Sequence, residues 1–148
     1  MNEFLEFAEM KQMDEMAVRM MNPLKLAFLG DAIYEAYIRT YLMTQHVMTP
    51  HEMSKMSRKF VKASAQAEAV HAIKPLLSES EWQMIKRGRN QNSASVPKNA
   101  VLADYRYATG FEALIGYLYL TNQKTRLYEV VHEVIKVLTK EEASKDES

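Results

Sequence analysis

A glycine and an aspartate interrupt an otherwise apolar helical segment, and this pair constrains the fold more than any other feature of the chain. Asn22 can cap the helix and Pro23 suits its first position, so we expect a helix that continues to Tyr41. Gly30 inside this helix costs about 1 kcal/mol relative to alanine, and a helical glycine usually marks the close approach of another backbone. Asp31 must find a hydrogen bond, a cation or a metal if it is buried. The segment therefore predicts a closely packed helix that carries a site.

A second apolar segment, residues 108–120, repeats this combination with Gly110, Glu112 and Gly116. Two helices packed about 8–10 Å apart would bring Asp31 and Glu112 close enough to share one cation. Two carboxylates completed by water suit Mg²⁺, or Mn²⁺ in its place, better than zinc. The chain has no Cys, and its four His show no metal-ligand spacing, so a zinc site is not expected.

The two segments resemble the two motifs of the ribonuclease III catalytic domain. The first motif is Leu-Ala-Phe-Leu-Gly-Asp-Ala at 26–32, and the second is Phe-Glu-Ala-Leu-Ile-Gly at 111–116. Their order and separation, and the short chain, resemble the branch called mini-ribonuclease III, which lacks a double-stranded-RNA-binding domain. This resemblance extends over residues 13–138. It implies an all-α helical homodimer that uses Mg²⁺ to hydrolyse phosphodiesters in double-stranded RNA, leaving 5′-phosphate and 3′-hydroxyl ends.

The resemblance also implies residue roles and a substrate. Asp31 and Glu112 match the catalytic metal ligands of the family, and Phe28 matches an aromatic residue that enters a socket on the partner subunit. The implied substrate is precursor large-subunit (23S) ribosomal RNA, with a ribosomal protein that presents the substrate as a further candidate partner. A twofold dimer would give each RNA strand its own pair of acids.

Two positions depart from the pattern of the larger enzymes of this family. Ala27 stands where they carry a Glu, and Thr109 stands where they carry an Asp. One cation held by Asp31, Glu112, waters and the scissile phosphate remains sufficient for hydrolysis. The alternative is a catalytically impaired member that binds double-stranded RNA without cutting it. A purely structural helical dimer is a third interpretation, but it leaves the two acids without a purpose.

Two further acids are candidates for supporting roles at the site. Glu35 lies one helical turn after Asp31, and Asp104 lies two turns before Glu112. Each could orient a water or a metal ligand, and each could equally be structural.

A basic stretch without acids follows the middle of the chain, although the net charge is zero, with 19 Lys and Arg against 19 Asp and Glu. We expect it to be a loop that contacts RNA phosphates and 2′-hydroxyls. Its candidate RNA-binding residues are Lys86, Arg87, Arg89, Asn90 and Lys98. A second basic cluster, with Lys55, Arg58, Lys59 and Lys62, could extend this surface or be ordinary solvated helix.

The remaining pattern is helical and predicts one domain over residues 1–140, followed by a polar tail at 141–148 that we expect to be disordered. Thr49 and Ser78 each open a predicted helix, a further helix should begin near Pro97, and the last should begin near Lys124. The Thr49 helix should carry one continuous buried stripe, Met53, Met56, Phe60, Ala63, Ala67 and Val70. The N-terminus is acidic where a signal peptide needs positive charge, and no apolar run could span a bilayer. These features favour a cytoplasmic protein without a membrane partner.

Overall fold

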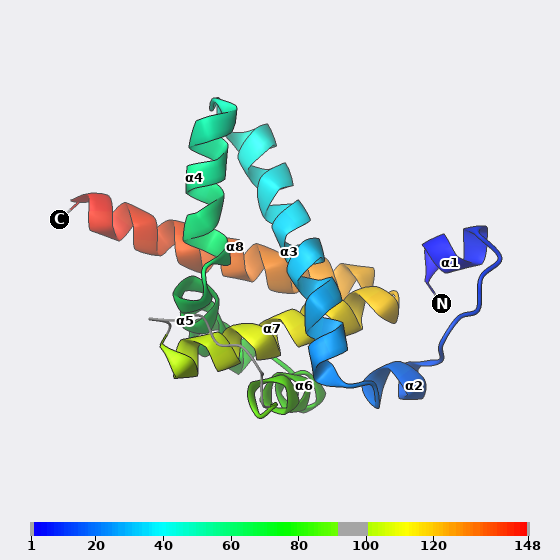
Figure 1. Ribbon diagram of the computed structural model, residues 1–148. Helices are drawn as coiled ribbons and strands as arrows, with labels where there is room; N and C mark the ends of the chain where they lie inside the picture. The colour runs from blue at the N-terminus through cyan, green and yellow to red at the C-terminus, as the bar shows by residue number, and fades with distance from the viewer. Residues whose placement is uncertain (1, 92–100, 148) are drawn as a thin grey trace.

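The computed structural model of the chain describes residues 2–91 and 101–147, with the side chains described as far as residue 140. Every regular element in these residues is helical, which confirms the prediction of an all-α fold (Figure 1). The elements are α1 (Glu3–Phe7), α2 (Glu15–Arg19), α3 (Pro23–Gln45), α4 (Pro50–Val61), α5 (Ala63–Ile73), a short 3-10 turn (Lys74–Leu76), α6 (Glu79–Arg89), α7 (Leu102–Leu120) and α8 (Lys124–Glu147). No described helix has the length and apolarity that a membrane crossing needs.

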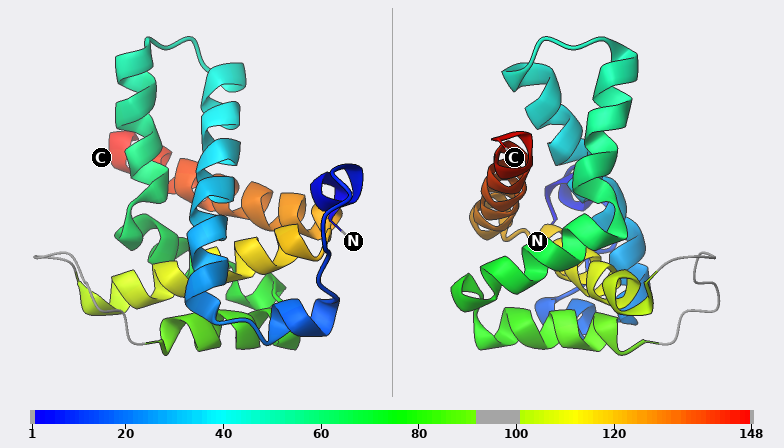
Figure 2. Two further views of the ribbon diagram at one scale, coloured as in Figure 1. Left: turned by 45° about the vertical axis from the view of Figure 1, so that its right-hand side comes forward. Right: turned by 90° about the vertical axis from the view of Figure 1, so that its left-hand side faces the viewer.

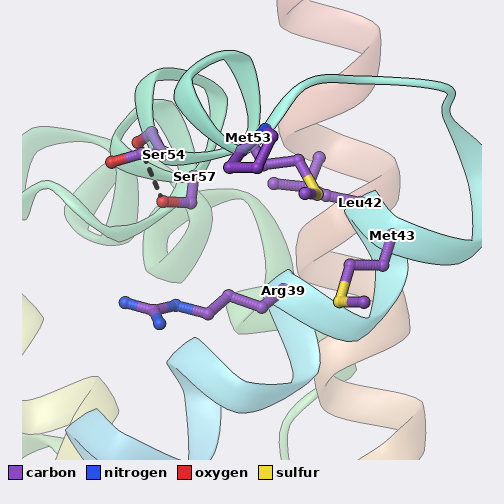
Figure 3. Close-up of a pocket in the computed structure, with 7 residues that line it drawn as sticks. Arg39, Leu42, Met43, Met53, Ser54 and Ser57 are labelled. Carbon is purple, nitrogen blue, oxygen red and sulfur yellow. Dashed lines mark hydrogen bonds between the residues drawn. The ribbon is translucent and has the colours of Figure 1, made fainter.

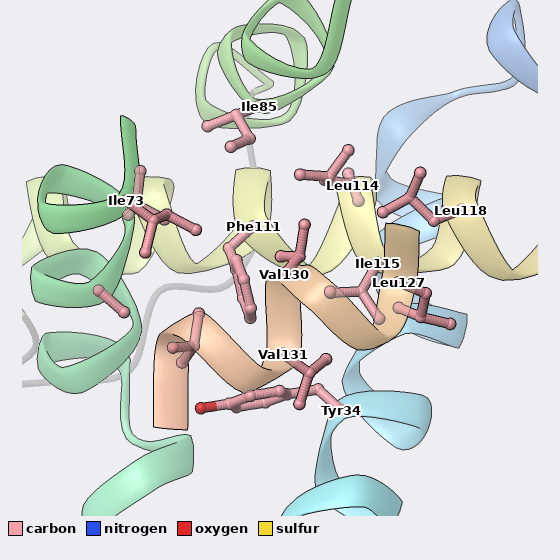
Figure 4. Close-up of a cluster of buried hydrophobic side chains, with 14 of the residues drawn as sticks. Tyr34, Ile73, Ile85, Phe111, Leu114, Ile115, Leu118, Leu127, Val130 and Val131 are labelled. Carbon is pink, nitrogen blue, oxygen red and sulfur yellow. The ribbon is translucent and has the colours of Figure 1, made fainter. Parts of the chain in front are cut away.

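Helix α7 lies at the centre of the molecule, and α3, α5, α6 and α8 pack around it. Figure 2 shows α3 crossing α7, and α8 leading back from the end of α7 at an angle to it. Side chains from these five helices form one core, drawn in Figure 4, where Phe111 and Tyr34 meet edge to face with ring centroids 5.1 Å apart. This arrangement explains why the α7 segment is apolar on almost every side.

The backbones of α3 and α7 touch where they cross, and two glycines allow this contact. A Cβ atom on Gly30 would lie 1.7 Å from the Glu112 carbonyl oxygen, and one on Gly116 would lie 2.1 Å from the Leu26 carbonyl oxygen. The close approach expected from Gly30 is therefore confirmed. The crossing also fixes the position of Asp31, which follows Gly30 on α3.

The capping predictions are confirmed at three helices. The Asn22 side chain accepts a hydrogen bond from the Leu24 amide at the start of α3. Thr49 with Glu52 and Ser78 with Glu81 form complete capping boxes. Helix α3 is longer than expected and ends at Gln45 rather than Tyr41.

The prediction of one helix carrying the stripe from Met53 to Val70 is wrong, because the chain bends at Lys62. This residue is extended, with φ −63° and ψ 152°, and it separates α4 from α5. The bend turns α5 onto α7 and α8, so that Val70 enters the core instead of continuing along the direction of α4.

Two other predictions fall at the edges of the described residues. The expected helix start near Pro97 lies outside them, and α7 is described from Leu102 onward. Helix α8 begins at Lys124 as expected and continues to Glu147, through the positions assigned to a polar tail.

Candidate active site

The crossing of α3 and α7 brings Asp31 and Glu112 together. Asp31 follows Gly30 directly on α3, and Glu112 contributes the carbonyl that faces Gly30 on α7. The two carboxyl groups share a hydrogen bond. Asp31 is exposed whereas Glu112 is half-buried, so the pair has one side in the protein and one side open to a ligand.

Burial and the neighbouring charge give Glu112 unusual acid-base behaviour. Loss of solvation raises the pKa of the Glu112 carboxyl to about 9, and the hydrogen bond and charge of Asp31 act in the same direction. Burial, followed by the charge of Glu112, also raises the pKa of Tyr34, whose hydroxyl donates to the Phe60 carbonyl at 2.9 Å. In the absence of a cation, the acid pair therefore holds a proton at neutral pH.

The donor set of this pair fits a hydrated hard cation. Two carboxylates crowded together favour any positive charge that can replace the shared proton. Among the described residues, no cluster of three or more His, Cys, Asp or Glu side chains could enclose a metal. A site with two protein carboxylates and several remaining positions for water matches the preference of Mg²⁺.

A third side chain lies at the site, Gln66 on α5, and the sequence did not indicate it. Its amide hydrogen-bonds the Glu112 carboxylate, and this contact favours the ionised form of the acid. Gln66 is only 2% exposed. The available signal was a polar residue within an alanine-rich stretch beside the buried stripe, and that pattern alone indicates a surface position.

The two positions that lack the expected carboxylates are occupied by residues that contribute no ligand to the pair. Ala27 is buried on α3. The Thr109 hydroxyl donates to the Tyr105 carbonyl at 3.0 Å, one turn earlier on α7. The acid pair therefore stands without these two carboxylates.

The two candidate supporting acids, Glu35 and Asp104, have different surroundings. The Glu35 carboxylate pairs with Arg39 at 2.7 Å, one turn further along α3. Asp104 is half-buried in the first turn of α7, about 12 Å along the helix axis from Glu112.

An open pocket between α3 and α4 holds about 250 Å³ and lies further along α3 than Glu35 (Figure 3). Arg39, Leu42, Met43, Pro50, Met53, Ser54 and Ser57 line this pocket.

The basic residues assigned to a loop belong largely to a helix. Lys86, Arg87 and Arg89 form the last turn of α6, and Asn90 is its C-cap. Positive charge at this end complements the helix dipole. The predicted contact residue Lys98 lies outside the described residues.

The side chains in this turn of α6 have different partners. Arg87 donates to the Arg19 carbonyl and, at 3.2 Å, to the Met21 carbonyl, which ties α6 to the end of α2. The Arg89 guanidinium lies over the Tyr107 ring, 5.5 Å from its centroid, and donates to Asn90 Oδ1 at 3.0 Å. Arg87 thus acts in packing, while Arg89 lies against the first half of α7.

Phe28 projects from α3 and is 85% exposed. It lies three residues before Asp31, so the two side chains occupy neighbouring positions on the outer side of one helix. The role of Phe28 at a subunit interface stays a prediction.

Comparison with known proteins agrees with this architecture. The model of the ribonuclease III domain family matches residues 24–123. The chain is 46% identical over 131 residues to the Mini-ribonuclease 3 of Clostridium tetani, covering 88% of this chain and 85% of the relative. It is 47% identical over 120 residues to the Mini-ribonuclease 3 of Enterococcus faecalis, covering 80% of this chain and 91% of the relative.

A solved structure extends the likeness to three dimensions. The crystal structure of a protein from Fusobacterium nucleatum superimposes with a TM-score of 0.71 at 31% sequence identity, covering 80% of this chain and 95% of that chain. The family expected from the two glycine and acid motifs is confirmed by these matches. The chain belongs to the ribonuclease III family.

Proposed function

We propose that this chain is a Mg²⁺-dependent endoribonuclease that cleaves double-stranded RNA, with Asp31 and Glu112 holding the cation. Membership in the ribonuclease III family supports the activity. The observation that carries the assignment of residues is the hydrogen-bonded acid pair at the contact of α3 and α7. Such a pair inside an apolar helix crossing costs stability, and a bound cation offsets that cost.

The chemistry divides between the cation and the protein. When bound, a hard divalent cation supplies activation of water and stabilisation of charge on the phosphate. Glu112 would hold the cation as a carboxylate, with its proton released to solvent, and its half-buried side chain would lie on the protein side of the site. Asp31 is the exposed member of the pair, and in this proposal it would face the RNA. Attack by water on phosphorus leaves a 5′-phosphate and a 3′-hydroxyl, and it requires no Ser, Cys or His nucleophile.

The substrate within this class is precursor 23S ribosomal RNA, as the resemblance to mini-ribonuclease III implies, and a cytoplasmic location follows from that substrate. Two protomers would present two acid pairs to the two strands. Lys86, Arg89, Asn90 and Lys98 contact the RNA backbone in this proposal, and Arg87 supports them from within α6. A ribosomal protein that presents the RNA is a further partner consistent with the absence of a separate RNA-binding domain in that branch.

The test is cleavage of end-labelled duplex RNA with Mg²⁺, with Ca²⁺ and with chelator. We expect Mg²⁺-dependent cutting by the parent protein and at least a 1,000-fold loss, on the order of 4 kcal/mol in the barrier, in Asp31→Asn and in Glu112→Gln. Glu68→Gln changes an exposed acid on α5 and serves as the charge-matched control. Retained turnover in both acid variants would reject the assigned residues.

The second candidate function is RNA binding without cleavage, favoured by the two missing carboxylates at Ala27 and Thr109. The same experiment separates it. Salt-sensitive retention of duplex RNA with no product in Mg²⁺, unchanged in Asp31→Asn, would identify a binding protein.

A further inference from the structure

Gln66 is a buried polar residue whose hydrogen-bonding groups are only partly satisfied. It is 2% exposed, and its Oε1 atom is buried without a hydrogen-bond partner among the described residues. A buried acceptor without a donor destabilises the folded state, because it has lost its hydrogen bonds to water. The donor hydrogens of the amide, in contrast, do have acceptors, and these acceptors indicate the role of the residue.

The main chain fixes the orientation of this amide. Gln66 Nε2 donates to the Val61 carbonyl at 2.7 Å, and Val61 is the last residue of α4. Turning the amide over would place its oxygen against the carbonyl oxygen, so the NH₂ group must face Val61. The same side chain also hydrogen-bonds the Glu112 carboxylate, and an NH₂ group has two hydrogens for two acceptors.

These contacts connect the bend in the chain to the candidate site. The bend at Lys62 separates α4 from α5 and places Gln66 in the first turn of α5, against α7. A single straight helix would carry the side chain away from Glu112. The amide thus lies between a main-chain carbonyl that cannot move independently and a carboxylate that can rotate about its last side-chain bond.

We propose that Gln66 is a positioning residue of the metal site, which holds the Glu112 carboxylate in the orientation that lets it bind a cation together with Asp31. The inference rests on the proposed function, because it concerns the same site. Hydrogen bonds from groups behind a ligand commonly orient it, and their removal typically weakens metal affinity or activity about 10–100-fold.

The test measures Mn²⁺ binding to the RNA-free protein by the electron paramagnetic resonance signal of unbound Mn²⁺, a readout that does not depend on cleavage. Gln66→Met keeps the length of the side chain and removes both donor hydrogens. We expect its Mn²⁺ dissociation constant to rise about 10–100-fold, with cleavage restored at high Mg²⁺. Gln66→Asn keeps the amide but is one methylene too short to reach both acceptors. It should show the same loss of Mn²⁺ affinity, and it replaces Gln66→Met as the test if that variant fails to fold.

Val70→Ala is the matched control, because Val70 is buried one turn later on the same helix and makes no polar contact with the site. It should lower the melting temperature and leave Mn²⁺ affinity unchanged. A folded Gln66 variant that binds Mn²⁺ as tightly as the parent overturns the positioning role, and the proposed function then stands if Asp31→Asn has lost binding. Equal weakening in Val70→Ala also overturns the role. A parent protein that neither binds Mn²⁺ nor cleaves RNA overturns both proposals.

Discussion

At the scale of single residues, the candidate site depends on one acid that is costly to ionise. Glu112 lies among Asp31, Tyr34 and Gln66, and its ordinary pKa of 4.5 rises to about 9 through burial and the neighbouring acid. The unfolded chain would release this proton near pH 4.5. The folded, metal-free protein therefore binds more protons than the unfolded chain between these two pH values, and its stability must fall as the pH rises.

This difference predicts the pH dependence of folding. In chelator, the stabilisation from the protonated Glu112 is fully present below pH 4.5 and is lost as the pH rises to about 9. The melting temperature of the parent protein should fall through this range more than that of Glu112→Gln, which carries no titrating group there. Added Mg²⁺ should oppose the fall, because the cation replaces the proton. Parallel melting curves for the two proteins across this range would contradict the assigned environment.

The arginines of α6 provide a second prediction at this scale. Arg87 is bound to two main-chain carbonyls near the end of α2, whereas Arg89 lies over Tyr107. Arg87→Gln should lower the free energy of unfolding by about 1–3 kcal/mol, because two partly buried carbonyl groups lose a charged donor. Arg89→Gln should leave stability nearly unchanged and reduce the salt dependence of duplex-RNA binding by about one unit in the log-log slope.

The measurements are urea unfolding and RNA retention over a salt series, applied to both variants. A reversed outcome, in which Arg87→Gln affects only RNA binding, would place the RNA surface on the other side of α6.

At the scale of elements, the site exists because two helices meet without side chains between them. Gly30 and Gly116 each face a carbonyl oxygen of the opposite helix. Asp31 follows Gly30, and Glu112 supplies the carbonyl that Gly30 faces, so the two acids are held at one contact. The glycines are thus part of the site although neither carries a functional group.

This contact predicts the sign of a substitution. In an exposed helix, Gly→Ala stabilises by about 1 kcal/mol. Gly30→Ala should instead destabilise by about 3 kcal/mol, because its Cβ would lie 1.7 Å from the Glu112 carbonyl oxygen. Ala36→Gly, at an exposed position of α3, is the control and should cost about 1 kcal/mol. Denaturant unfolding measures both, and a stabilised Gly30→Ala would show that the helices do not touch there.

The sequence predicted this contact because an apolar helix rarely carries a glycine beside an acid unless another backbone packs against it. It did not predict the bend at Lys62, since apolar spacings of three and four continue through the bend and neither Gly nor Pro marks it. The position of Gln66 relative to Glu112 depends on that bend, so the sequence did not indicate that Gln66 belongs to the site. Lys86 and its neighbours are polar, and a polar stretch with Gly and Asn predicts a loop. The same residues can also continue a preceding helix, and here α6 continues through them to Arg89.

At the scale of the whole molecule, the expected dimer interface can be tested at one exposed side chain beside the site. Phe28 is 85% exposed and lies next to Asp31 on the outer side of α3. A protomer docked on Phe28 would therefore border the acid pair, and twofold symmetry would repeat that arrangement on the second protomer. Dimer formation and cleavage of both strands should then depend on the same surface.

Phe28→Asp tests this dependence, because it adds a charge to an apolar contact and removes no buried contact within the protomer. We expect sedimentation velocity to show a monomer with an unchanged helical spectrum, and duplex cleavage to fall about 100-fold or more since one monomer presents only one acid pair. Phe7→Asp is the matched control, since Phe7 is 89% exposed on α1, and it should remain dimeric and active. A dimeric Phe28→Asp would place the interface elsewhere, whereas a monomeric variant with full activity would show that each protomer cleaves by itself.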